Sequence, residues 1–248
     1  MARRRFFVNE VRGGRAEITG ESAHHLTRVL RVEAGQKYEI TDNHRVWLAE
    51  VAAARRALVE FTVIEELAAG PEPAQTTLYL ALIKFDRFEW ALEKATELGV
   101  TRIVPVQTQR SERGLEEGAR KRVERWRRIA HEASEQSRRL RAPEIADPLR
   151  FSKILAETSG PGLWLDEKPG APPLIKAAST GIGNSVAVAV GPEGGWADAE
   201  REEFGAAGWL AASLGPSVLR AETAVCAALA VIVQIRLADA IDRYNRME

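Results

Sequence analysis

Two glycine-rich turns are the strongest sign of a ligand site in this sequence of 248 residues. The motif Gly-Pro-Glu-Gly-Gly at 191–195 follows an apolar run at 186–190, and Leu-Gly-Pro at 214–216 follows a second run that ends near Ser213. Glycine tolerates a left-handed backbone and lets the main chain approach a ligand closely. On spacing alone, however, two ordinary tight turns are the better explanation, so the surroundings of these glycines must decide.

The motifs of the commoner nucleotide and hydrolase sites are absent. The chain has no Gly-x-Gly-x-x-Gly after the expected strand at 78–83, no Gly-Lys-Ser/Thr loop and no Gly-x-Ser-x-Gly elbow. Its four histidines include one adjacent pair, His24 and His25, and its one cysteine is Cys226, which we interpret as a small core residue. We therefore expect neither a metal site nor a Ser-His-Asp triad. An enzyme built this way needs a cofactor that carries its own reactive group.

The distribution of charge leaves two interpretations open. The chain as a whole is neutral, but residues 120–141 carry nine Lys or Arg against three Glu. A solvated helix face accounts for such a run. An arginine-rich N-terminus in the same chain raises the case for a polyanionic partner, because guanidinium groups pair with phosphate and stack on bases.

The first 70 residues are typical of a small β-barrel. The segment 21–31 has the apolar spacing of one helix, with its apolar face at Ala23, Leu26, Val29 and Leu30. Several short strands with few helices are characteristic of a barrel. The expected strands are 5–11, 15–19, 37–41, 46–52 and 58–64.

Beyond a linker at 71–76, which is rich in proline, the pattern changes to alternating strands and helices. This alternation predicts an α/β domain over 77–248 with a mainly parallel sheet. In such a sheet, ligands bind outside the carboxyl ends of the strands, which is where both glycine-rich turns fall. The expected strands are 78–83, 102–106, 163–165, 185–190 and 209–214, and the expected helices are 88–98, 116–140 and one that starts at Glu222.

No stretch approaches the ~18 to 20 consecutive apolar residues that a membrane span requires. The longest, 224–233, is short and is followed by Gln234 and Arg236. The N-terminus has no apolar core or cleavage site of a signal peptide. We therefore expect a cytoplasmic protein that contacts no membrane.

At its glycine-rich turns the sequence resembles the RsmE family, a group of SPOUT-superfamily methyltransferases that modify ring nitrogen 3 of a uridine in bacterial 16S ribosomal RNA. The resemblance rests on the motifs at 191–195 and 214–216 together with Leu-Arg-Ala-Glu-Thr-Ala at 219–224. Blocks at 5–8, 24–31, 94–99 and 135–139 extend it over nearly the whole chain. The set in this order is highly specific, although each block alone would be weak. The chain departs from the family at Arg138, where many members have glycine, so the family arginine aligns with Arg139.

The resemblance implies a fold and partners that composition and spacing do not. The fold would be an α/β SPOUT-type parallel-sheet domain with a trefoil knot, preceded by a small PUA-like β-barrel that binds RNA. The cofactor would be S-adenosyl-L-methionine, and the substrate would be 16S ribosomal RNA of the small ribosomal subunit. The enzyme would be a homodimer. The small residues at 224–230 are compatible with this, because they would let the last helix pack closely against a partner.

The resemblance also suggests roles for individual residues. Arg220 is the candidate for stabilising negative charge on the uracil oxygens, and Glu222 and Thr223 are the candidates for positioning the base or relaying its proton. A residue at the start of a helix, as Glu222 would be, is also favoured by the helix dipole alone. The residues expected to hold the cofactor are Leu165, Val190, Gly191, Glu193, Gly194, Gly195, Ser213, Leu214, Gly215, Val218, Leu219 and Ala224. Those expected to contact RNA phosphates are Arg5, Arg28, Arg31, Arg138 and Arg139.

Two other functions remain open from the sequence. One keeps the fold but methylates another RNA target, such as a ribose hydroxyl. The other is a ribosome-assembly factor that binds RNA without catalysis. Retention of both glycine-rich turns with an arginine at 220 favours a working cofactor site.

Overall fold

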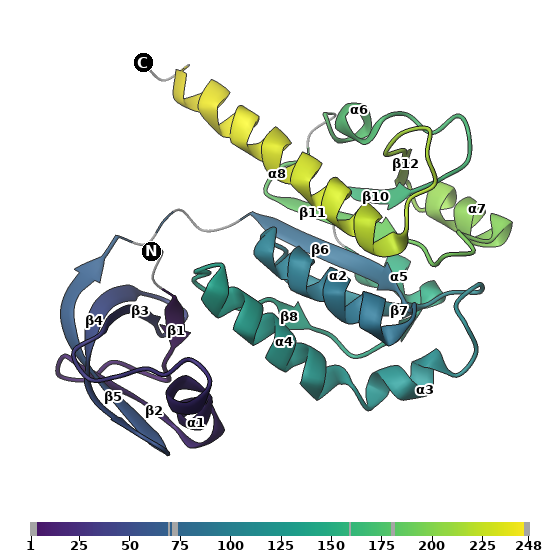
Figure 1. Cartoon of the computed structure of the whole chain (residues 1–248). Coiled ribbons are helices and arrows are strands. Elements are labelled where there is room, and N and C mark those ends of the chain that lie inside the picture. Colours follow the sequence, from purple (N-terminus) through teal and green to yellow (C-terminus); the bar gives the residue numbers. More distant parts are fainter. Residues whose placement is uncertain (1–3, 69, 71–73, 159, 180–181, 246–248) are drawn as a thin grey trace. The chain divides into compact units, whose positions relative to one another are not determined.

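The computed structural model describes residues 4–68, 70, 74–158, 160–179 and 182–245. The chain forms two compact units: unit 1 comprises Met1–Glu72 together with Glu132–Ala142, and unit 2 comprises Pro73–His131 together with Pro143–Glu248. The first three residues of the expected linker lie outside the described residues. Each unit has its own core and is described separately (Figure 1).

Unit 1 is built on a curled five-stranded sheet in the order β1-β3-β4-β5-β2. Helix α1 covers the sheet with Ala23 and Leu26, as the spacing predicts, whereas Val29, expected on the same face, lies just beyond the helix and is 64% exposed. The strands β4 and β5 form a long hairpin whose register shifts between Leu48 and Ala49 and between Val51 and Ala53. Such bulges bend a strand and help the sheet to curl. The elements are β1 Arg5–Phe7, β2 Arg15–Thr19, α1 Gly20–Arg28, β3 Lys37–Thr41, β4 Val46–Arg55 and β5 Leu58–Leu67.

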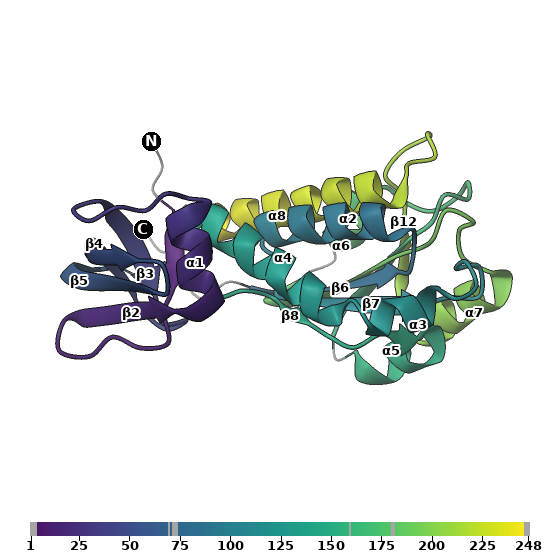
Figure 2. The same ribbon diagram turned by 60° about the horizontal axis from the view of Figure 1, so that its bottom comes forward.

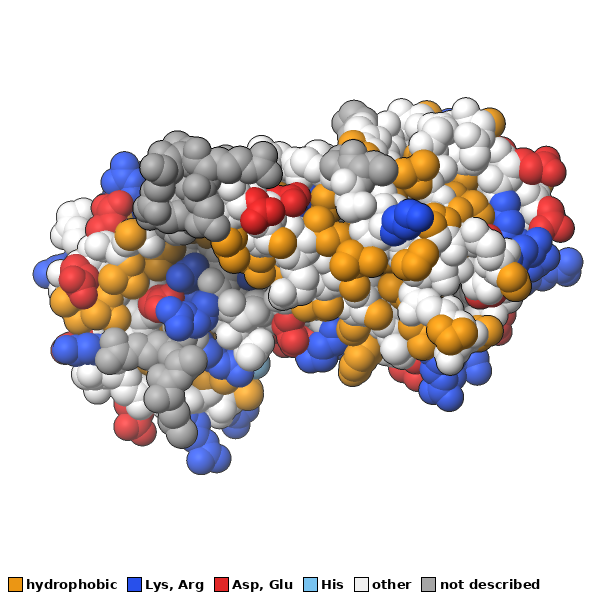
Figure 3. Space-filling view, turned by 90° about the horizontal axis from the view of Figure 1, so that it is seen from above, with side chains coloured by type: hydrophobic (Ala, Val, Ile, Leu, Met, Phe, Trp, Pro, Cys, Tyr) orange, Lys and Arg blue, Asp and Glu red, His pale blue; other side chains and the backbone are white. Residues whose placement is uncertain are grey.

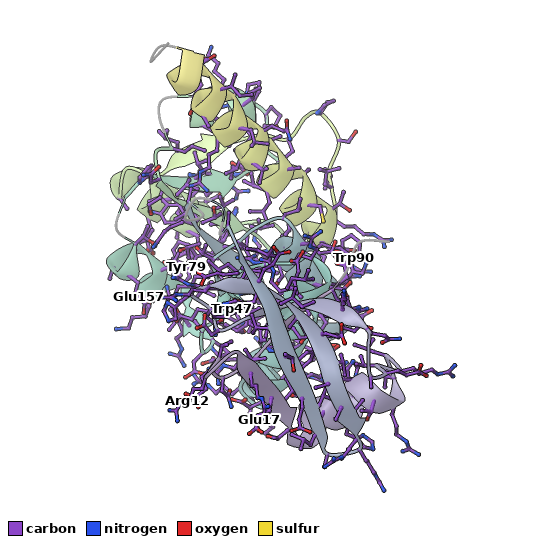
Figure 4. All side chains as sticks on the ribbon, turned by 90° about the vertical axis from the view of Figure 1, so that its left-hand side faces the viewer. Arg12, Glu17, Trp47, Tyr79, Trp90 and Glu157 are labelled. Carbon is purple, nitrogen blue, oxygen red and sulfur yellow. The ribbon has the colours of Figure 1, made fainter. Side chains whose placement is uncertain are left out.

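Alternation along the strands decides which side chains of unit 1 are buried. In β2, Ala16 and Ile18 are buried while their neighbours are exposed. Trp47 lies in the core, whereas Arg12 and Glu17 project from the outside of the sheet (Figure 4). The expected strands at 15–19 and 37–41 are confirmed residue for residue, and the hairpin strands run three residues further than expected.

The segment 132–142 is tied to the sheet of unit 1 by a buried carboxylate. Glu39 on β3 accepts two hydrogen bonds from Arg5, at 3.0 and 2.8 Å, and pairs also with Arg138. Thr41 donates to the carbonyl oxygen of Leu140 at 3.3 Å. Two guanidinium groups therefore compensate the one carboxylate that the sheet buries here.

Unit 2 is an all-parallel sheet in the order β12-β10-β11-β6-β7-β8, with β9 paired to β7. Continuous apolar runs such as Val186–Val190 are buried on both faces, as expected for a sheet with helices on each side. The strands are β6 Gln75–Ala81, β7 Arg102–Gln107, β8 Glu144–Ile145, β9 Leu149–Arg150, β10 Gly162–Leu165, β11 Ser185–Val190 and β12 Leu210–Ala212. The helices are α2 Phe85–Glu97, α3 Leu115–Arg120, α4 Val123–Gln136, α5 Phe151–Glu157, α6 Leu174–Ala178, α7 Asp198–Ala206 and α8 Ala221–Asn245.

The two faces of this sheet have different cores. Leu78 and Leu80 of β6 point to one face, where α2, α4, α6 and α8 supply the apolar partners (Figure 2). Tyr79 points to the other face, which α5 and α7 cover with aromatic side chains. There the Trp164 and Phe204 rings stack with centroids 5.3 Å apart. The predicted α/β class with a parallel sheet is confirmed, while the trefoil knot stays a prediction.

The structure corrects the prediction of one long helix at 116–140. The chain forms α3 and α4 instead, because the amide of Arg122 bonds to Ala119 three residues back and tightens the turn between them. Helix α4 ends early because Arg138 takes a left-handed φ of 58°. The short elements β8, β9, α5, α6 and α7 were not expected. Strand β12 is shorter than the range 209–214, and α8 starts one residue earlier than expected.

Glu135 makes the stability of unit 1 dependent on pH. Burial raises its pKa to about 7 from an ordinary value of 4.5, against the opposing effects of Arg4 and the Phe7 amide. The folded state therefore binds this proton more tightly than the unfolded state. Stability falls as the pH rises from 4.5 to about 7 and is constant above that range, a loss on the order of 3 kcal/mol at most.

We expect Glu135→Gln to remove most of this pH dependence, because glutamine keeps an acceptor for the Phe7 amide but carries no charge. Urea unfolding of the full chain, followed by pulsed hydrogen exchange of peptides from β1 and β3, gives the stability at about pH 5.5 and at about pH 8. The matched control is Glu17→Gln, which changes an exposed glutamate on β2 that does not contribute to the pKa shift of Glu135. An unchanged pH slope in Glu135→Gln would show that Glu135 is not the titrating group.

Candidate functional site

The carboxyl ends of three neighbouring strands of unit 2 surround a cavity of about 160 Å³. Strand β11 continues into the 191–195 turn, β12 into the 213–219 loop, and β10 ends at Leu165 beside them. The order β12-β10-β11 places these three ends side by side although they lie far apart in the sequence. The cavity therefore occurs where the parallel-sheet rule predicts a ligand site.

The cavity walls contain every residue that the sequence analysis expected to hold the cofactor. The apolar part of the lining includes Leu165, Val190, Leu214, Leu219 and Ala224, joined by Ala221. The backbone of the two glycine-rich turns supplies much of the remainder. The other expected residues that line it are Gly191, Glu193, Gly194, Gly195, Ser213, Gly215 and Val218.

Gly195 is required by the backbone of its turn. Its φ is 67°, a conformation that residues with a side chain rarely adopt. A Cβ there would overlap the carboxylate oxygen of Glu167, which lies across the turn. Gly191 is needed for a different reason, because a Cβ at that position would lie 3.1 Å from the Trp196 ring.

Two fixed contacts hold the β10 end against the 191–195 turn. The indole Nε1 of Trp196 donates to the carbonyl oxygen of Leu165 at 2.9 Å. The guanidinium of Arg201 pairs with Asp166 at 3.0 Å and with Glu167 at 3.0 Å, and also donates to the Trp196 carbonyl. Because the Arg201 side chain is only 10% exposed, these partners compensate a largely buried charge.

A buried carboxylate joins the loop after β7 to the same turn. Glu200, which is 4% exposed, accepts hydrogen bonds from the amides of Gln109 and Ala197, each at 2.8 Å. On the same loop, Arg110 donates to the carbonyl oxygen of Gly194 at 2.8 Å. The walls of the cavity are thus cross-linked by polar contacts between segments distant in sequence.

The three catalytic candidates stand beside the cavity and are not part of its lining. Arg220 is exposed and immediately precedes α8, and Thr223 is exposed on the first turn of that helix. Glu222 is largely buried, and its Oε2 has no hydrogen-bond partner within the described part of the chain. Arg87 of α2 lies between two carboxylates, with Nη1 3.2 Å from Glu193 Oε1 and Nε 4.0 Å from Glu222 Oε1.

The five arginines expected to contact RNA belong to unit 1, and the structure separates them into two groups. Arg5 and Arg138 are engaged with the buried carboxylate on β3. Burial lowers the pKa of Arg139 to about 10, so this side chain remains charged at neutral pH. Arg28, Arg31 and Arg138 are exposed, and of these three Arg138 is the one that pairs with the buried carboxylate.

The sequence analysis missed several residues of the site. Asp166, Glu167, Trp196 and Ser217 also line the cavity. The two acidic residues directly follow the strand end at Leu165, so the strand-end rule could have found them. Arg87 and Arg110 follow the ends of β6 and β7 in the same way, but their partners lie more than 80 residues away. No group of three or more His, Cys, Asp or Glu that could hold a metal ion occurs among the described residues.

Comparisons with known proteins agree with this geometry. The sequence model for an RNA methyltransferase domain matches residues 70–233, and that for an RNA methyltransferase PUA domain matches residues 18–64. Ribosomal RNA small subunit methyltransferase E of Synechocystis is 35% identical over 87% of this chain and 71% of its own length. The Bacillus subtilis protein of that name is 32% identical over 87% of this chain and 88% of its own length.

A solved structure is similar over both units. The Neisseria gonorrhoeae ribosomal RNA small subunit methyltransferase E, bound to S-adenosyl methionine, has a TM-score of 0.83 with 27% identity. The match covers 94% of this chain and 98% of that one. Fold and cavity together define an RNA methyltransferase with an N-terminal PUA domain. Within that class, the chain belongs to the ribosomal RNA small subunit methyltransferase E family, as the resemblance at the glycine-rich turns predicts.

We expect Gly195→Ala to weaken S-adenosylmethionine binding by about tenfold or more, since the new Cβ both strains the turn and displaces Glu167 into the cavity. The matched control is Gly208→Ala, whose φ of 76° is similarly left-handed but which has nothing within 4 Å of the added Cβ. Calorimetry of both variants separates backbone strain from a change in the cavity. Equal affinities in the two variants would remove the 191–195 turn from the cofactor site.

Proposed function

We propose that this protein uses S-adenosyl-L-methionine to methylate a uridine base at ring nitrogen 3 in 16S ribosomal RNA of the small subunit. The observation that carries the proposal is the cavity at the carboxyl ends of β10, β11 and β12, with Arg220 and Glu222 beside it. The names of the relatives specify ribosomal RNA of the small subunit as their target. The uridine and its ring nitrogen come from the family resemblance.

The residues of the cavity fit this cofactor by their chemistry. The apolar side chains on the wall, such as Leu165 and Leu219, suit the flat adenine ring. Asp166, Glu167 and Glu193 place carboxylate oxygens at the cavity as hydrogen-bond acceptors. Arg201 and Arg87 balance their charge. When bound, S-adenosylmethionine supplies a methyl group that its sulfonium has already activated. The protein must therefore supply orientation and an unprotonated ring nitrogen.

Glu222 is the group best placed to accept the proton from that nitrogen. Its Oε2 is buried and has no partner in the described part of the chain, and a buried acceptor of this kind gains from a ligand N–H. As the proton passes to Glu222, the ring nitrogen forms its bond to the methyl carbon. The bound cofactor would supply the methyl group, and its sulfur would keep the electron pair of the methyl–sulfur bond. Thr223, exposed one residue further on, is the alternative positioning group.

Arg220 has a complementary role in this mechanism. Loss of the proton moves negative charge onto the two carbonyl oxygens that flank the nitrogen. A guanidinium stays charged at working pH and offers several donors in a planar fork, so Arg220 can stabilise these oxygens but cannot act as an ordinary base.

We assign RNA binding to unit 1 and to two of its exposed arginines, Arg28 and Arg31. They lie on α1 and directly after it, within the range matched by the PUA model. Arg5, Arg138 and Arg139 remain candidates, although each is partly engaged or buried within unit 1. Many basic residues of 120–127 pair with glutamates, which supports the solvated-face interpretation for that stretch.

We propose a homodimer in which α8 contributes to the interface. The length and apolar composition of this helix would also suit a membrane span. Core helices of soluble proteins share both properties, so they do not by themselves indicate a membrane protein. One side of it, including Val225, Leu229 and Ile232, packs in the core of unit 2. Leu237 and Ile241 are more than half exposed. Hydrophobic side chains also gather on the face of unit 2 that Figure 3 shows. A second copy explains both faces of α8 and agrees with a cytoplasmic enzyme.

The test of the proposed function is methylation of small subunits purified from a strain that lacks the enzyme, followed by mass spectrometry of the nucleosides. We expect 3-methyluridine to form with the protein and S-adenosylmethionine together. A methylated ribose would indicate the alternative in which the fold acts on another RNA target. Cofactor binding without any methylation, or RNA binding without cofactor binding, would support the assembly factor.

We expect Arg220→Ala to lower the single-turnover rate about 10²- to 10³-fold at saturating RNA, the range seen when an oxyanion donor is removed. Arg220→Lys should restore little, because an ammonium cannot reproduce the planar fork. Arg28→Ala is the contrasting variant and should mainly raise the KM for RNA. A normal single-turnover rate in Arg220→Ala with weakened RNA affinity would make Arg220 a binding residue.

A further inference from the structure

Arg87, near the start of α2, is the one guanidinium in contact with both glutamates of the site among the described residues. It donates a hydrogen bond to Glu193 of the 191–195 turn at 3.2 Å. Its Nε lies 4.0 Å from Oε1 of Glu222, which is too long for a hydrogen bond but close enough for strong attraction. The side chain is 30% exposed, so water screens this attraction only in part.

The contact with Arg87 leaves the other carboxylate oxygen of Glu222 unused. The Glu222 side chain is 14% exposed, and its Oε2 is buried without a partner among the described residues. A buried acceptor without a hydrogen bond destabilises the folded protein unless a ligand supplies a donor. Arg87 thus attracts one oxygen of the carboxylate while the other remains available.

We propose that Arg87 is a positioning residue for methyl transfer: it fixes the Glu222 carboxylate so that Oε2 receives the proton of the target base. This inference rests on the proposed function. The same guanidinium links Glu222 to Glu193 on the 191–195 turn. It therefore fixes the position of the proton acceptor with respect to the proposed cofactor site. Arg87 itself touches neither the base nor the methyl group.

Charge balance explains why a cation is needed at this position. Glu193 and Glu222 both lie within 4.0 Å of one guanidinium, and two carboxylates brought together without it would repel. Without Arg87, Glu222 would turn towards solvent or towards Arg220, two residues earlier in the chain. Either movement withdraws the proton acceptor, and the second also occupies the guanidinium that stabilises the uracil oxygens.

The experiment measures single-turnover methylation at saturating RNA and cofactor for Arg87→Ala and Arg87→Lys. We expect Arg87→Ala to slow the step about tenfold to a hundredfold, as a misplaced catalytic group does, with cofactor affinity and the KM for RNA within about twofold of wild type. Lysine should restore most of the rate, because the contact to Glu222 depends on charge. This response is the opposite of that expected at Arg220.

The matched control is Glu89→Ala, which removes an ion pair on the same helix. Glu89 is bonded to Arg125 at 2.8 and 2.9 Å and belongs to no part of the proposed site. We expect this variant to methylate at the wild-type rate. A loss of rate in Glu89→Ala as large as that in Arg87→Ala would show that α2 is merely destabilised and would overturn the proposal.

A double-mutant cycle decides whether Arg87 acts through Glu222. In a Glu222→Gln background, Arg87→Ala should change the rate by less than about twofold, because the carboxylate it positions is gone. Independent, multiplicative losses would overturn the proposal, and so would a wild-type rate in Arg87→Ala. Failure of the proposed function is distinguishable, since the wild-type protein would then form no 3-methyluridine.

Discussion

An all-parallel sheet is the constraint from which the site of unit 2 follows. Parallel neighbours cannot be joined by tight hairpins, so every strand end returns through a crossover and the carboxyl ends collect at one edge. The order β12-β10-β11 places the ends of three strands together, and each of them opens into an irregular loop. These loops expose main-chain groups to a ligand, while the two apolar cores hold the strands beneath them in a fixed register.

Paired charges then make this edge rigid. Arg201 joins the β10 end to Trp196 beside the 191–195 turn, and Arg110 joins that turn to the loop after β7. Arg87 joins the turn to the first turn of α8. Buried or half-buried ions contribute little net stability when paired, but removing one partner leaves a costly charge behind. Their value here is geometric, because methyl transfer depends on aligning a donor, an acceptor atom and a base.

The sequence predicts the site better than it predicts the helices around it. The sequence predicts a strand at 185–190, which the structure confirms as β11, and the glycines that follow it lie at the expected edge of the sheet. The resemblance then supplied roles that periodicity could not supply. The break between α3 and α4 was missed because Ala119, Val123 and Trp126 keep helical spacing across the turn. Arg87 and Arg110 were missed because their partners are distant in sequence. In unit 1, Arg5 and Arg138 were expected to contact RNA, but both pair with Glu39, which the sequence analysis did not consider.

The central claim is that one edge of unit 2 binds S-adenosylmethionine through loops that the parallel sheet brings together. Hydrogen-exchange mass spectrometry of the full chain with and without the cofactor tests this claim most directly, because it reports each loop separately. The account predicts slower exchange in peptides covering 165–168, 190–197 and 213–221, with β1 to β5 of unit 1 unchanged. Protection confined to unit 1, or to only one of the three loops, would contradict it.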